Sequence, residues 1–142
     1  MSTWIADTGA FVAALDPSDF HHTRVAAALQ SERPHLWTTV PVITEALHLL
    51  SEGTDAPAKL LELLRRTHAR IEGTAEWNTL QSAVTLMEKY ADLPMDFADA
   101  SLVVLSEKIG VRDILTTDER GFRVFRINGR QGFHLVLDDF EA

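Results

Sequence analysis

The hydrophobic positions of the chain fall into two kinds of pattern. Short apolar runs that end in polar or turn residues predict β-strands, and apolar residues at helical spacing predict α-helices. The two patterns alternate, which favours an α/β protein whose parallel sheet is covered on both faces. The predicted strands are residues 3–6, 35–38, 69–72, 113–116, 122–126 and 133–137. The predicted helices are residues 8–15, 18–31, 56–67, 75–90 and 97–109, with another from residue 40 to Glu52-Gly53.

Three of these helices carry apolar residues at a spacing that predicts a face turned toward the core. The expected core residues are Phe20, Val25, Ala26 and Leu29 in the second helix, Leu60, Leu61, Leu63 and Leu64 in the fourth, and Trp77, Leu80, Val84 and Met87 in the fifth. His21 and His22 are expected to be surface or packing residues, because adjacent side chains on a helix point in different directions.

Composition narrows the class of protein. At 142 residues, with 46% hydrophobic and 24% charged residues, the chain is expected to form one globular domain over residues 1–142. It has no cysteine, no apolar run near the roughly 20 residues of a membrane span and no signal-peptide pattern, so we expect a cytoplasmic protein without membrane contact. The net charge of −8 argues against general electrostatic binding of nucleic acid, unless divalent cations or a basic partner reverse the charge locally.

Four acidic residues stand out by their positions. Asp7 ends the first predicted strand, and Asp118 follows a late one in Thr116-Thr117-Asp118. Glu45 lies inside the apolar stretch of a helix, and Asp99 lies in the first turn of an apolar helix. Because a parallel sheet brings strand ends and helix starts to one edge, we expect all four carboxylates to meet in one cleft.

Each acid also has a purely structural interpretation. Asp7 is a preferred residue for capping the helix that follows it, and Asp118 is suited to capping a turn. Asp99 and Asp96 have the spacing of a capping box, so Asp96 is either the N-cap or a residue that supports the metal ligands. Glu45 in an apolar face would need a basic partner if no metal binds there. Thr8 and Thr117 are candidates for orienting the ligands by hydrogen bonds.

The acidic set has a chemical consequence if the four side chains do meet. Like charges raise one another's pKa, and a hard divalent cation such as Mg²⁺ relieves the repulsion. Such an ion lowers the pKa of a bound water and clamps the oxygens of a phosphodiester during in-line attack. The predicted chemistry is therefore metal-assisted phosphodiester hydrolysis. Arg120, Arg123, Arg126 and Arg130 follow the last acid, either to hold substrate phosphates or to form a solvated strand edge.

Four segments together resemble the PIN-domain family, and most closely the VapC-type toxins of bacterial toxin–antitoxin pairs. They are Ile5-Ala6-Asp7-Thr8-Gly9-Ala10-Phe11, Thr44-Glu45-Ala46, Asp96-Phe97-Ala98-Asp99-Ala100-Ser101-Leu102 and Leu115-Thr116-Thr117-Asp118-Glu119-Arg120-Gly121-Phe122. The resemblance spans nearly the whole chain, and the acids occur in the family's order. The chain departs from the family's pattern at Gly9, where serine or another polar residue is frequent.

The resemblance implies a three-layer α/β/α fold with a central, mainly parallel sheet. It also implies an endoribonuclease that depends on Mg²⁺ or Mn²⁺, with Asp7, Glu45, Asp99 and Asp118 at the conserved acidic positions. It further implies a homodimer that is inhibited by a cognate antitoxin, whose C-terminal segment covers the cleft. Residues 18–31 and 40–67 are candidates for the antitoxin contact or for the dimer face.

Two other classes of function remain as alternatives. An aspartate-nucleophile phosphatase also has an aspartate after its first strand, but it normally needs a second one two positions later, where this chain has Gly9. A catalytically degenerate domain that only binds a partner would not need intact acids at all four positions. Binding of a divalent cation separates this last alternative from an enzyme.

Overall fold

The structure is a computed structural model, and it describes residues 1–51 and 55–140. Five parallel strands form the main sheet in the order β3-β2-β1-β4-β7, and β5 and β6 form a short antiparallel pair. The strands are β1 Thr3–Ala6, β2 His35–Thr39, β3 Arg70–Glu72, β4 Asp113–Leu115, β5 Arg126–Ile127, β6 Gln131–Gly132 and β7 His134–Leu135. The prediction of an α/β protein with a parallel sheet is confirmed.

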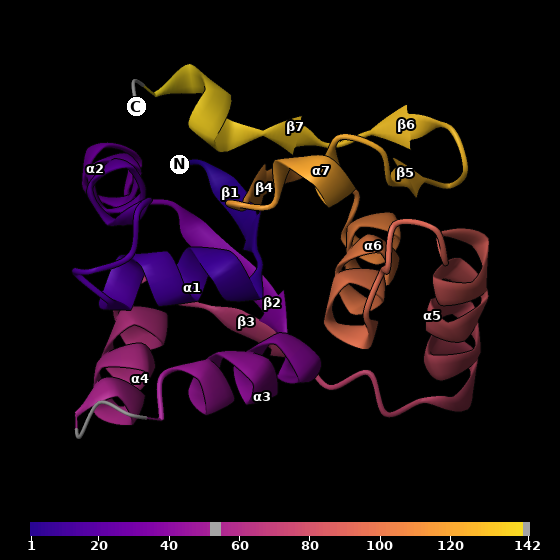
Figure 1. Ribbon diagram of the computed structural model, residues 1–142, viewed down its shortest axis with the longest axis horizontal. Helices are drawn as coiled ribbons and strands as arrows, with labels where there is room; N and C mark the ends of the chain where they lie inside the picture. The colour runs from indigo at the N-terminus through magenta and orange to yellow at the C-terminus, as the bar shows by residue number, and fades with distance from the viewer. Residues whose placement is uncertain (52–54, 141–142) are drawn as a thin grey trace.

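Helices lie on both sides of the main sheet. They are α1 Thr8–Leu15, α2 His22–Glu32, α3 Val40–Leu49, α4 Ala56–Arg66, α5 Trp77–Lys89, α6 Phe97–Ile109 and α7 Glu119–Phe122. The chain steps outward from β1 to β3 through the first four helices, and α5 and α6 carry it back to β4. Crossovers between parallel strands are right-handed, so the helices on the outward path from β1 and the helices on the return path to β4 cover opposite faces of the sheet. Figure 1 shows α1, α2 and α4 on one side of the strands and α5 and α6 on the other.

The order of the strands reverses between β1 and β4. The chain leaves β1 toward β2 and returns on the other side, where Ile5 pairs with Ile114 and Ala6 pairs with Leu115. In open α/β sheets, ligands bind at the carboxyl ends of the strands at such a switch point. Asp7 follows β1 directly, so the fold places this carboxylate at the position where a ligand site is expected.

Burial in the core explains the apolar sequences of strand β1 and helix α6. Ile5 and Ala6 in β1 are fully buried, because helices cover both faces of the central strand. Helix α6 is buried at Ala100, Leu102 and Val103, on more than one face, because it lies between α5 and the rest of the molecule. In the part of the chain that the structure describes, no helix is long and apolar enough to cross a membrane.

Two helices expose residues that were predicted to be in the core. Helix α2 begins at His22, not at Ser18, because Asp16 and Asp19 accept hydrogen bonds from the amides of Ser18 and His21 and hold a turn there. Phe20 lies in this turn and is 93% exposed, whereas Val25 is buried. In α4, Leu61 points to solvent while its three neighbouring leucines are buried. The predicted helix end at Glu52-Gly53 lies outside the described residues.

The predicted inward face of α5 is wrong. Trp77, Leu80 and Val84 are 72%, 39% and 43% exposed. The helix packs through Ala83, with Met87 partly buried beside it. Helix α5 is the outermost element on its side of the molecule and packs mainly on α6, so only a narrow stripe is covered. The spacing of these residues correctly predicted that one face of α5 is apolar, but it could not predict whether another element of the chain covers that face.

The last third of the chain is less extended than predicted. Residues 122–126 were expected to be a strand, but the helix α7 ends at Phe122 and a turn follows. A strand would have placed Phe122 and Phe125 on opposite faces, whereas the turn buries both in one aromatic cluster. Residues 133–137 contain only the short strand β7, and a 3₁₀ helix, Val136–Asp139, follows it.

Candidate active site

Asp7 is both a helix cap and a buried carboxylate at the switch point. Its Oδ1 accepts a hydrogen bond of 2.9 Å from the amide of Ala10, so it caps α1 as one interpretation predicted. Its Oδ2 accepts a hydrogen bond from the Thr116 hydroxyl. The residue is only 4% exposed. Capping uses one oxygen and leaves further lone pairs on the carboxylate, so capping and ligand binding are compatible.

Thr116 joins the ends of β1 and β4, and the sequence did not single it out as a site residue. Its hydroxyl oxygen donates to Asp7 and accepts from the amide of Asp118 at 2.9 Å. The same threonine is buried. The hydroxyl therefore fixes the distance between two of the four acids. Its place directly after a buried strand, two residues before an acid, is the signal that could have identified it.

Asp118 lies at the N-terminus of the short helix α7. Its Oδ1 accepts a hydrogen bond of 3.1 Å from the amide of Gly121. A Cβ atom on Gly121 would lie 2.8 Å from Asp118 Oδ2 and 2.9 Å from the Phe125 ring, which is closer than real Cβ contacts allow. Gly121 is therefore needed to let the chain turn tightly around this carboxylate.

Asp99 and Asp96 form the predicted capping box at the start of α6. Asp96 Oδ1 accepts from the amide of Asp99 at 2.8 Å, and Asp99 Oδ2 accepts from the amide of Asp96 at 3.3 Å. Asp96 is therefore the N-cap of α6 and is exposed, whereas Asp99 is half-buried. The box fixes the orientation of Asp99 relative to the start of α6.

Glu45 lies half-buried in the middle of α3. This helix begins at Thr39, whose hydroxyl is hydrogen-bonded at 2.7 Å to that of Ser101 in α6, and both residues are fully buried. The contact ties the start of α3 to the first turns of the helix that carries Asp99. Among the residues described, no lysine or arginine forms an ion pair with Glu45 or with the other three acids.

The pKa values show that the four acids act on one another. Burial, with a smaller contribution from the negative charges of Asp118 and Glu45, raises the pKa of Asp7 to about 7 against the lowering effect of its hydrogen bonds. Burial also raises the pKa of Asp99 to about 8, with added repulsion from Asp96 and Asp7. Asp7 therefore interacts electrostatically with each of the other three acids, which together are called the acidic cluster below, and their role as one site stays a prediction.

The donor set at this cluster fits a hard divalent cation. Carboxylate oxygens are the ligands that Mg²⁺ takes in proteins, and it keeps several water molecules when only one or two carboxylates bind it directly. Burial is the main cause of the raised pKa values of Asp7 and Asp99, and neighbouring carboxylates add to both, so ionising these groups costs free energy that a bound cation would offset. Within residues 1–51 and 55–140, no three acidic or histidine side chains already enclose a space for one ion. The meeting of all four carboxylates around one ion therefore stays a prediction.

Three of the four arginines that follow Asp118 were predicted to contact RNA, and they differ in their contacts. Arg123 forms two hydrogen bonds to Asp138, at 2.7 and 3.0 Å, and Arg126 Nη1 donates to three backbone carbonyl groups. Arg120 is exposed on α7. A role for these side chains in RNA binding stays a prediction.

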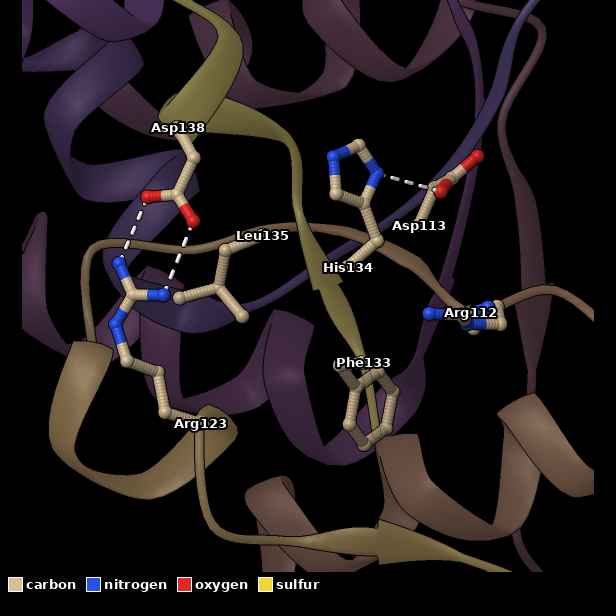
Figure 2. A pocket seen from close by; sticks show the side chains of 7 residues that line it. All are labelled: Arg112, Asp113, Arg123, Phe133, His134, Leu135 and Asp138. Carbon is tan, nitrogen blue, oxygen red and sulfur yellow. Dashed lines mark hydrogen bonds and ion pairs between the residues drawn. The ribbon is translucent and has the colours of Figure 1, made fainter. Parts of the chain in front are cut away.

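A separate hollow of about 550 Å³ lies beside β7. Figure 2 shows its two ion-paired contacts, between Arg123 and Asp138 and between His134 and Asp113. None of the four acids lines this hollow. The hollow therefore is not part of the acidic cluster, although Arg123 lies in it.

These features define a class of protein, an α/β domain with an acidic, cation-suited site at the switch point of a parallel sheet. The family model of the PIN domain matches residues 5–127, which include all four acids, and the chain belongs to this family. The chain is 29% identical to Ribonuclease VapC26 of Mycobacterium tuberculosis (strain ATCC 25618 / H37Rv) over 136 residues, 93% of this chain and 98% of that protein. The crystal structure of M. tuberculosis VapC20, described as a sarcin-ricin loop cleaving toxin, has the same fold, with a TM-score of 0.74 at 19% identity over 87% of this chain and 96% of that one.

Proposed function

We propose that this protein is a metal-dependent endoribonuclease that acts as the toxin of a toxin–antitoxin pair. The observation that supports the proposal is the buried carboxylate of Asp7 at the switch point, whose pKa of about 7 is raised in part by the charges of Glu45 and Asp118 and whose own charge helps to raise the pKa of Asp99 to about 8. The relation to a protein named a ribonuclease supports RNA as the substrate. A toxin of this kind meets its RNA in the cytoplasm, where we place the protein.

The four acids would hold Mg²⁺ or Mn²⁺, and Asp96, Thr8 and Thr117 would support them. The ion would supply a nucleophilic water and stabilise the charge on the phosphate during hydrolysis. The protein's own contribution is the placement of the carboxylates: Thr116 fixes Asp7 relative to Asp118, and the capping box fixes Asp99. Arg120, Arg123 and Arg126 are proposed to contact the phosphates of the RNA.

The test is RNA cleavage by the purified protein with Mn²⁺ or with a chelator. We expect cleavage only with the ion, and a loss of at least about a hundredfold in Asp7→Asn, because asparagine keeps the helix cap but loses the charge. Thermal unfolding of the variant checks that the fold is kept. If the variant cuts RNA at the parent rate, or if the parent cuts RNA in chelator, the metal-dependent mechanism is wrong. A covalent phosphate on Asp7 would instead indicate a phosphatase.

The antitoxin is proposed to bind in a hollow of about 840 Å³ between α1, α2 and α4. Leu29 and Leu63 line its apolar part, and Arg33 and Arg66 lie in the same lining. This combination suits a segment with apolar and acidic side chains. Co-expression with the product of a small gene directly upstream tests the proposal: Leu29→Asp should abolish protection from toxicity, whereas Lys59→Glu, outside the hollow, should not.

The protein is further proposed to form a homodimer through the exposed stripe of α5. Trp77, Leu80 and Val84 recur on one helix face and are all exposed, which marks an interaction surface when such residues are contiguous. The mass in solution tests this: Trp77→Glu should give a monomer. Leu61→Glu on α4 should leave the dimer intact, and the opposite result would move the dimer face to the helices of residues 40–67.

A further inference from the structure

Gly9 has no conformational reason to be glycine. It lies in the first turn of α1, and its φ is not in the left-handed region, so any residue could adopt its backbone conformation. Alanine is the better helix former at such a position. The reason for glycine is therefore space and not backbone geometry.

The space above Gly9 is filled by a hydroxyl group from another segment. A Cβ atom on Gly9 would lie 2.5 Å from Thr117 Oγ1, which real Cβ atoms essentially never do. The same position is 3.8 Å from Asp7 Oδ1. The missing side chain at residue 9 thus leaves a space that the Thr117 hydroxyl occupies and that the Asp7 carboxylate borders.

This hydroxyl is free to bind a ligand. Among the described residues, Thr117 Oγ1 makes no hydrogen bond, although its neighbour Thr116 makes two. The side chain is partly exposed, so a ligand can reach it. The Thr8 hydroxyl is also without a partner, but it is covered by protein atoms. Among the described residues, Thr117 is therefore an available donor at the space that Asp7 borders.

We propose that Thr117 is a positioning residue of the acidic site. Its hydroxyl, seated over Gly9, donates a hydrogen bond to an oxygen atom bound to the cation, either a water molecule or a phosphate oxygen of the RNA. This inference rests on the proposed metal-dependent function. It assigns Gly9 a specific purpose, which is to leave room for the hydroxyl group.

The test combines Mn²⁺ titration calorimetry without RNA and cleavage kinetics, applied to the parent, four test variants, a Thr117→Ala reference and one control variant. Thr117→Val keeps the volume and removes the hydroxyl, and Thr117→Ser keeps the hydroxyl. Groups that orient metal ligands through hydrogen bonds are typically worth about ten- to a hundredfold in metal affinity or activity. We expect a loss of this size in Thr117→Val and near-parent behaviour in Thr117→Ser. A loss of Mn²⁺ affinity identifies a water as the acceptor, and a change confined to kcat or KM identifies a phosphate oxygen.

The other two variants test the role of Gly9. Gly9→Ala should displace the hydroxyl and reproduce the loss seen in Thr117→Val. Gly9→Ala combined with Thr117→Ala should be no worse than Thr117→Ala alone, because the added methyl group then enters the vacated space. Thr85→Val, on the exposed face of α5, is the control and should change nothing.

The outcomes separate this inference from the proposed function. If the parent binds Mn²⁺ and cuts RNA but Thr117→Val equals the parent in both measurements, the inference is wrong and the proposed function stands. If Thr117→Ser loses as much as Thr117→Val, the hydroxyl is not the active group and the inference is also wrong. A parent protein that binds no Mn²⁺ would overturn both.

Discussion

At the scale of single residues, Asp7 combines two roles that usually fall to different side chains. It caps α1 through one oxygen and contributes charge to the acidic cluster, where burial raises its pKa to about 7. A carboxyl group with a raised pKa favours the folded state when it is protonated and disfavours it when it is ionised. The site is thus stabilised by acid or by a cation, and strained without either.

The first prediction concerns the pH dependence of the metal-free protein. Stability from Asp7 is fully present below its ordinary pKa of 3.8 and is lost as the pH rises through about 7. Asp7→Asn removes this loss, so at pH 8.5 we expect the variant to be more stable than the parent, by an amount on the order of a few kcal/mol. Denaturant unfolding in chelator at pH 5 and pH 8.5 measures it.

Asp16 provides the control for this measurement. Hydrogen bonds from Ser18 lower the pKa of Asp16, so its contribution has the opposite sign. Asp16→Asn should give no gain in stability at pH 8.5. An Asp7→Asn variant that is less stable than the parent at high pH would show that Asp7 is not strained by burial.

The second prediction concerns Gly121. Alanine there would place a methyl group 2.8 Å from Asp118 Oδ2 and 2.9 Å from the Phe125 ring. Because the ring is in a packed cluster, we expect a destabilisation of about 1–3 kcal/mol and a weaker Mn²⁺ isotherm. Gly129→Ala, at a turn with nothing near the added atom but a φ of +73°, separates the effect of backbone strain from that of crowding. Parent-like stability and Mn²⁺ binding in Gly121→Ala would contradict the tight turn.

At the scale of elements, the site depends on how three elements end or begin. Strand β1 ends at Ala6, β4 ends at Leu115, and α6 begins after Asp96. A side chain forms hydrogen bonds at each of these three places, and the Thr116 hydroxyl connects the end of β4 to Asp7 at the end of β1. The acids are therefore presented by rigid elements whose ends are fixed by hydrogen bonds, an arrangement that holds a metal site more accurately than loops do.

The third prediction tests the start of α6. Asp96→Ala removes the N-cap, and we expect a loss of about 0.5–2 kcal/mol in unfolding free energy. The charge repulsion that Asp96 exerts on Asp99 also disappears, so the pKa of Asp99 should fall from about 8. Asp96→Ser keeps a capping oxygen and removes the charge, so it should lower this pKa without the loss in stability. A pKa that stays the same in both variants, measured by NMR titration, would show that the two carboxyl groups do not interact.

At the scale of the whole molecule, the sequence predicted the fold class better than it predicted which apolar residues are exposed. Asp7, Asp99 and Asp118 could be placed because strand ends and helix starts meet at one edge of any parallel sheet. Thr116 was missed because its role depends on β1 pairing with β4, which are more than a hundred residues apart. Trp77 was wrongly predicted to be buried, because the spacing of apolar residues indicates an apolar helix face but not whether other elements pack on it. Phe125 was misplaced because a local turn outweighed strand propensity.

The fourth prediction concerns the stability of the whole fold with a cation. Binding to the folded state alone raises the unfolding free energy by about 2.7 kcal/mol at a hundredfold excess over the dissociation constant. Because the ligands must be ionised, Mn²⁺ should raise the unfolding temperature by several degrees at pH 8 and by much less at pH 5.5. Thermal scans with Mn²⁺ and with chelator at both pH values measure this. An equal shift at both values would place the ion elsewhere.

The most direct measurement is anomalous diffraction from crystals soaked in Mn²⁺, using protein shown to cut RNA. We expect an anomalous peak among Asp7, Glu45, Asp99 and Asp118, with at least one carboxylate oxygen at about 2.0–2.2 Å and the remaining acids held through water. The same soak of Asp7→Asn crystals should lose the peak. Active protein whose crystals show no peak at the four carboxylates, or a peak only beside β7, would contradict the assignment of this cluster as the catalytic centre.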